Sequence, residues 1–316
     1  MKLAAPTTLT KLEQAIWRTV AYVDLFDYPL TAVEIHRYLD SVPATASEVA
    51  RMLVGSAALT DHLSHHAGFF CLPQREEIVE IRHERRRRAQ QLWPEAVRYG
   101  RLIARLPFVR MVAVTGSLAM NNVAEDADID YFLVTENGRL WLTRALVIAI
   151  VRLAARRGVI LCPNYFVAES ALTLPERNIY TAREIVQMVP LFGHDIYKQL
   201  RQHNCWASQF MPNADGPPLV QIPEPEPASW PQTVAELPLR TPLGAWLEQW
   251  EQARKIEKLR SQQNGSGESL FTAVICKGHF QAHQQRTLTA YQHRLNTSTD
   301  FADYTDKNQN NLRKSA

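Results

Sequence analysis

The chain has 316 residues, a formal net charge of +3 and a pI near 8.7. This length leaves room for two or three domains of ordinary size, and the charge balance permits a polyanionic partner without requiring one. The four cysteines lack the spacing of a disulfide framework or of a zinc site, which favours a reducing, cytoplasmic location: Cys71, Cys162, Cys205 and Cys276.

We expect no membrane segment. The N-terminus lacks the long apolar core of a signal peptide. The most apolar helix candidate, residues 140–153, contains Arg144 and Arg152 and is too short to span a bilayer.

Residues 1–75 predict a winged helix-turn-helix domain. Apolar residues recur at helical spacing over 12–26, and Thr31 with Glu34 has the pattern of a capping box at the start of a second helix. Three further segments complete the domain: a third helix over residues 47–55 and two apolar runs that predict a hairpin, 59–63 and 69–72.

The third helix of such a domain lies in the DNA major groove and needs basic or amide side chains there. Here it offers one cation, Arg51, and carries Glu48. We therefore expect a packing or protein-contact module rather than a sequence-specific DNA reader.

Residues 76–105 predict a long basic helix that links two domains. Five arginines fall within residues 82–88, and the apolar pattern places Arg82 and Arg86 on the outward face. One interpretation is that these arginines bind nucleic-acid phosphates or a nucleotide's triphosphate. The other, which we favour, is a solvated face whose arginines pair locally with four acids: Glu76, Glu77, Glu80 and Glu84.

Residues 112–134 contain the most informative pattern. An apolar run ends in Gly116-Ser117, and Asp128-Ile129-Asp130 then opens a second apolar run, which predicts a strand, a turn into a short helix and a second strand. Alternation along a strand puts both aspartates on one face, close enough to share one or two hard cations, and turns Ile129 to the core. Gly116 lacks a Cβ where another group approaches the backbone, and Ser117 offers an N–H and a hydroxyl to a phosphate.

These residues resemble the signature of the nucleotidyltransferase superfamily typified by DNA polymerase beta. The resemblance covers residues 111–167 and implies an α/β (α+β) nucleotidyltransferase core with a mixed sheet, here residues 106–212. It implies that Asp128 and Asp130 are catalytic ligands of Mg²⁺ or Mn²⁺, and that Gly116 and Ser117 contact the triphosphate. The implied substrates are a nucleoside triphosphate, with ATP first, and a hydroxyl on an unknown acceptor: a small molecule, RNA or protein.

The chain departs from the family pattern at two positions. The strand over residues 159–167 holds Asn164 where a third carboxylate is expected, and an amide adds no negative charge and takes no proton. Glu169, just beyond that strand, is a candidate replacement. Asn121 stands in place of a glycine, a mild change because Asn tolerates a left-handed turn.

Two functional hypotheses follow. The first is an active nucleotidyltransferase whose general base is unassigned. The second, favoured by Asn164, is a catalytically silent fold that binds a nucleotide or a partner as a regulator, including one associated with DNA through weak nucleic-acid contacts.

The remainder predicts mostly helices. We expect residues 182–201 to form a helix interrupted at Pro190 and Gly193. We expect a second helix over residues 243–260, with Trp246 and Trp250 on its apolar face. The other segments are a proline-rich linker or arm over 213–242, a C-terminal helical region over 243–296 with a strand before its last helix, and a disordered tail over 297–316.

Overall fold

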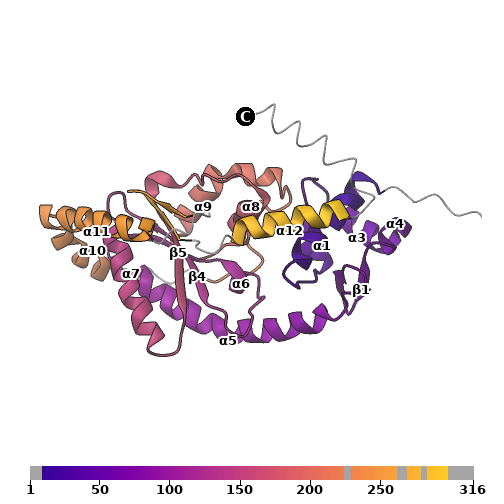
Figure 1. Ribbon diagram of the computed structural model, residues 1–316, viewed down its shortest axis with the longest axis horizontal. Helices are drawn as coiled ribbons and strands as arrows, with labels where there is room; N and C mark the ends of the chain where they lie inside the picture. The colour runs from indigo at the N-terminus through magenta and orange to yellow at the C-terminus, as the bar shows by residue number, and fades with distance from the viewer. Residues whose placement is uncertain (1–8, 224–228, 262–268, 279–282, 298–316) are drawn as a thin grey trace, which may run out of the picture.

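A six-stranded mixed sheet forms the centre of the computed structural model, which describes residues 9–223, 229–261, 269–278 and 283–297 (Figure 1). The strand order is β6-β3-β4-β5-β8-β7. Strands β4 and β5 are parallel and are connected by α7 (Leu140–Ala155), and the other described strand pairs of this sheet are antiparallel. The predicted mixed α/β class is confirmed. The strand bounds are β3 Val109–Val114, β4 Ile129–Thr135, β5 Leu161–Ala168, β6 Val189–Phe192, β7 Leu270–Phe271 and β8 Ile275–Lys277.

Helices cover both faces of this sheet. One face packs against α5 (Ile78–Ala104), α7 and α11 (Pro242–Ser261), and the other packs against α8 (Ile179–Gln187) and α9 (His194–His203). Alternation along β4 sends Ile129, Tyr131 and Leu133 to the first core, and Phe132 and Val134 to the second. Asp130 therefore belongs to the face that α8 covers.

The N-terminal unit, residues 9–72, contains four helices and a hairpin. Three of its helices begin with complete capping boxes, including the predicted pair Thr31 and Glu34. The prediction of a strand over 59–63 is wrong: Leu59 lies in a short helix, and the hairpin turns at Ala67-Gly68, both at positive φ. The elements are α1 Lys11–Asp24, α2 Ala32–Arg37, α3 Ala46–Gly55, α4 Ala57–Thr60, β1 Ser64–His66 and β2 Phe69–Cys71.

The last helix, α12 (His283–Thr297), lies along this N-terminal unit and not on the sheet (Figure 1). Tyr291 packs edge-on against Tyr22 of α1, and its hydroxyl donates to Asp40 Oδ2 at 3.0 Å. Segments from opposite ends of the chain therefore share one hydrophobic core.

The long basic helix is present as α5, but Arg82 does not face outward as predicted. It is buried, with Nη2 at 2.6 Å from Glu34 Oε1 and its guanidinium over the rings of Tyr28 and Phe69. The reason is that the N-terminal unit packs against the first turns of α5 and supplies both an acid and two aromatic faces there. Farther along, Arg88 pairs with Glu84 one turn away, as the local-pairing interpretation expects.

The interruption at Pro190 and Gly193 is a strand, which the helical prediction missed. Residues of β6 pair with β3 at the edge of the sheet, where a proline is tolerated because one side of the strand needs no donor. Gly193 has φ 76° and separates β6 from α9.

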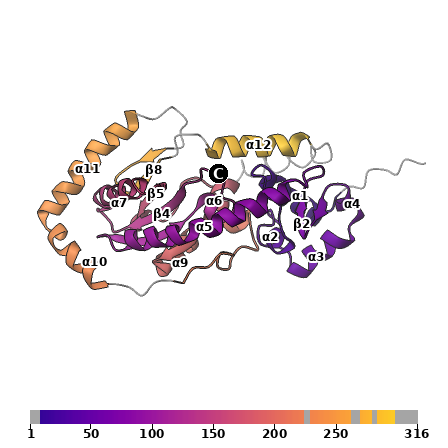
Figure 2. The ribbon, with the colours of Figure 1, turned by 90° about the horizontal axis from the view of Figure 1, so that it is seen from below.

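Part of the expected proline-rich arm is helical: α10 (Ser229–Glu236) and a 3₁₀ turn (Leu237–Arg240) precede α11. Glu236 anchors this segment by accepting from Arg110 Nη1 at 2.9 Å. These elements lie at the end of the molecule opposite the N-terminal unit (Figure 2).

The apolar pattern of residues 243–260 predicts the wrong buried face for α11. Trp246 and Trp250 are exposed, whereas Glu248 and Glu251 are each only 4% exposed. Within the part of the chain that the structure describes, no helix has both the length and the apolar character needed to cross a membrane. The expected tail beyond Thr297 lies outside the described residues.

Candidate functional site

The turn between β3 and α6 (Gly116–Ala119) lies against the start of β4. The Thr115 N–H donates to the carbonyl oxygen of Asp130 at 3.0 Å. Gly116 has φ 64°, and a Cβ added there would collide with the Asp130 carboxylate. The group that approaches the bare backbone of Gly116 is therefore Asp130 itself. Asn121, which stands where the resembling family has a glycine, has φ 53°, the left-handed conformation expected for it, and accepts a hydrogen bond from Trp93 Nε1 at 2.8 Å.

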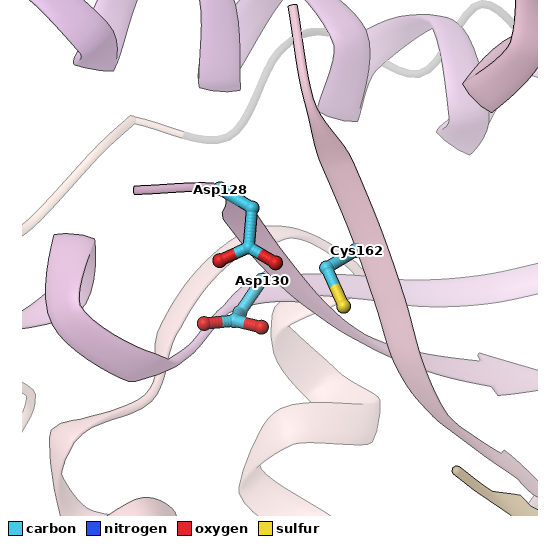
Figure 3. A group of neighbouring side chains, drawn as sticks. All are labelled: Asp128, Asp130 and Cys162. Carbon is cyan, nitrogen blue, oxygen red and sulfur yellow. The ribbon is translucent and has the colours of Figure 1, made fainter. Parts of the chain in front are cut away.

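Asp128 and Asp130 converge with the sulfur of Cys162 (Figure 3). Asp128 immediately precedes β4, Asp130 is its second residue, and Cys162 lies opposite Asp130 on the parallel strand β5. One ligand atom from each side chain lies within 4.8 Å of the other two, and all three side chains are partly exposed.

Asn164 also reaches this cluster, because β5 contains a bulge. The register with β4 shifts between the pairs Asp130–Cys162 and Phe132–Tyr165, so β5 has one more residue than β4 at this point, next to Pro163. Asn164 Nδ2 donates to Asp130 Oδ1 at 2.8 Å. The Asn164 amide therefore lies beside Asp130, at the position where the resemblance predicts a third carboxylate.

Glu169 does not lie near the cluster. It begins a 3₁₀ turn after the last residue of β5, at the opposite end of the strand from Cys162, near Arg110 and Glu136. The expectation that it replaces the missing carboxylate is wrong, because β5 stays paired with β4 up to Thr135 and Ala168, and Glu169 follows at that end, away from Asp130.

Sequence analysis missed Glu184 of α8. This half-buried acid lines a cavity of about 10 Å³, room for about one water molecule, together with Thr115, Asn164 and Tyr165. The buried Tyr165 hydroxyl, which belongs to the same lining, has no hydrogen-bond partner among the described residues. In the sequence, Glu184 is one polar position of an amphipathic helix. Only the packing of α8 onto the sheet reveals that Glu184 lies beside the site.

The site holds an excess of negative charge. Burial, then the neighbouring charges of Asp128 and Glu184, raise the pKa of Asp130 to about 8. Burial and the two aspartates likewise raise the pKa of the Cys162 thiol. Among the described residues, no Lys or Arg forms an ion pair with either aspartate. A bound cation would supply the opposite charge that the protein does not.

No protein-family model, curated protein or solved structure matches this chain. The functional argument therefore rests on the site. Two carboxylates, an amide and a thiol around one point are a donor set that fits a divalent cation.

Proposed function

We propose that this protein is a metal-dependent nucleotidyltransferase of the DNA polymerase beta-like class. It would transfer a nucleoside monophosphate from a nucleoside triphosphate, with ATP the first candidate, to a hydroxyl of an acceptor. The observation that carries the proposal is the contact between the Gly116 backbone and the Asp130 carboxylate, with Asp128 beside it. This contact joins the two halves of the sequence signature at one point.

In this proposal Asp128 and Asp130 hold Mg²⁺ or Mn²⁺, while Gly116 and Ser117 contact the triphosphate. The metal, when bound, activates the attacking hydroxyl and stabilises the departing pyrophosphate. Asn164 orients Asp130 through its hydrogen bond. Glu184, which lines the adjacent cavity, supplies the third negative charge that Asn164 lacks.

A second candidate is a catalytically silent fold that binds nucleotide or a partner as a regulator. The hydrogen bond from Asn164 to Asp130 favours it, because the amide donates to the carboxylate and takes no proton from an attacking hydroxyl. We propose that the N-terminal unit is a winged helix used for contact with the rest of the chain. Arg82, buried against Glu34, is not available to nucleic acid.

Isothermal titration of ATP with Mg²⁺ tests the site. We expect the double variant Asp128→Asn/Asp130→Asn to lose Mg²⁺-dependent ATP binding, because the carboxylate charges that hold the ion are gone. Asp126→Asn is the matched control, since it removes an exposed acid from the same loop. Unchanged binding in the double variant would place the site elsewhere.

Transfer is measured separately, with labelled nucleoside triphosphates and cell extract as the source of acceptors. An active enzyme releases pyrophosphate and labels a product, and the double variant does neither. Mg²⁺-dependent ATP binding without label or pyrophosphate would instead support the silent regulator.

A further inference from the structure

The sulfur of Cys162 is an unusual neighbour for a magnesium site. Mg²⁺ takes oxygen ligands in near-ideal octahedral geometry and gains nothing from a thiol. Zn²⁺ and Co²⁺ accept both carboxylate oxygen and thiolate sulfur, and Zn²⁺ prefers four ligands in a tetrahedron. The donor set Asp128, Asp130 and Cys162 therefore matches this second class of ion better than the first.

We infer that Asp128, Asp130 and Cys162 form a site for a divalent ion of the zinc class, with three protein ligands and one open position. The inference rests on the metal-ligand part of the proposed function and is independent of nucleotidyl transfer. An ion bound there occupies the carboxylates that Mg²⁺ needs, so the two metals compete.

The geometry supports one shared ion. Zn–S and Zn–O bonds are about 2.3 and 2.0–2.2 Å long, so the ligands of one tetrahedral ion lie roughly 3.5 Å apart. The three ligand atoms already lie within 4.8 Å of one another. Small side-chain rotations would bring them to the separation that one shared ion requires.

The ligands are also held in place by their surroundings. Asp130 and Cys162 are directly paired in the β4–β5 register, so their separation is set by the sheet and not by a loop. Asn164 Nδ2 donates to Asp130 Oδ1, the kind of outer-shell hydrogen bond that orients a ligating carboxylate. Cys162 binds as a thiolate, and its proton passes to solvent when the ion enters.

Co²⁺ is the probe for the test, because a cobalt–thiolate bond produces a charge-transfer absorption band in the near ultraviolet. We expect the wild-type chain to develop this band, to saturate at one ion per chain and to lose the band when Zn²⁺ is added. Equimolar Mg²⁺ should leave it unchanged.

Variants identify the ligands. Cys162→Ser should remove the band and weaken Zn²⁺ binding by more than the roughly 10–100-fold that follows loss of an outer-shell partner. Cys205→Ser is the matched control, because that thiol is exposed and outside the cluster, and it should keep the band. Asp128→Asn/Asp130→Asn should weaken Co²⁺ binding as well. Circular dichroism melting of each variant reports whether it is folded.

Three results would overturn the inference: no band in the wild-type chain, a band that survives in Cys162→Ser, or a band that Mg²⁺ removes as readily as Zn²⁺ does. The first and third need no variant, so a folding defect in Cys162→Ser leaves the test intact. Nucleotidyl transfer without the band would overturn only this inference. A Cys162-dependent band without transfer would overturn only the catalytic proposal.

Discussion

Two pairs of acidic residues invite comparison: the partly exposed Asp128 and Asp130 at the start of β4, and the buried Glu248 and Glu251 in α11. Hydrogen-bond donors of the protein itself satisfy the carboxylates of the second pair. Glu248 accepts the Trp141 and Leu142 N–H groups at 2.9 and 2.7 Å, which caps the N-terminus of α7, and Glu251 accepts from Arg254 Nε at 2.9 Å.

The first pair has a different environment. Asp130 is surrounded by Asp128, Glu184 and a thiol, and its described hydrogen-bond partners are an amide and that thiol. A buried carboxylate is costly unless donors or cations compensate it. The difference shows that the Glu248 pair is structural, and it supports our proposal that the Asp128 pair binds an ion.

The largest expected effect is on the pH dependence of stability. The pKa of Asp130 is about 8 when folded, against 3.8 in the unfolded chain, so between these values the folded state binds more protons. Without divalent metal, the free energy of unfolding should therefore fall as pH rises from about 4 to about 8. Asp130→Asn should remove most of this fall, and urea denaturation at about pH 5 and about pH 8 measures it. If the free energy of unfolding changed equally between these pH values in the wild type and in Asp130→Asn, the uncompensated environment of Asp130 would be contradicted.

The next largest effect is on stability. Comparing two glycine variants distinguishes the cost of disturbing the contact between Gly116 and Asp130 from the cost of backbone strain. Gly116 and Gly138 both have positive φ, but only at Gly116 does an added Cβ meet another group. Gly138→Ala should cost about 1–2 kcal/mol of stability through the left-handed backbone alone. Gly116→Ala should cost about 1–3 kcal/mol more through overpacking and should also weaken metal binding, because Asp130 is displaced.

Thermal melting and Co²⁺ titration of these two alanine variants measure both quantities. Equal losses in the two variants would show that Asp130 does not depend on the space beside Gly116.

The smallest effects compare two residues of α11. Glu248→Ala should cost about 1–3 kcal/mol, because it leaves two backbone N–H groups of α7 unsatisfied, and it should leave metal binding unchanged. Trp246→Ala, on the exposed face, should change stability by at most about 0.5 kcal/mol. Chemical denaturation of both variants checks the order. A larger loss from Trp246 would mean that the sequence pattern, and not the observed face, describes the helix.

Local sequence signals succeeded where the interaction partners are close in the chain. The capping box at Thr31, the left-handed turn at Asn121 and the strand that ends before Gly116 depend on neighbouring residues, and the structure confirms each. Such features follow from backbone sterics and short hydrogen bonds, which the sequence encodes directly.

Predictions failed where a distant segment decided the outcome. Arg82 is turned inward by Tyr28, Phe69 and Glu34, and β6 is a strand because β3 offers an unpaired edge. The two tryptophans of α11 are exposed because α11 turns its other face, with Glu248, toward the N-terminus of α7. Periodicity identifies an apolar face but not the element that covers it.

The amino-acid sequence by itself determined the two aspartates at the start of a strand and the glycine turn before them, because alternation and backbone freedom are local properties. Only the tertiary structure decided what surrounds them. Cys162 and Asn164 come from the register of a strand about thirty residues away, and Glu184 comes from a helix packed over the sheet. Long-range packing sets those positions, so the charge of the site, and the ion preference that we infer for it, depend on the folded chain.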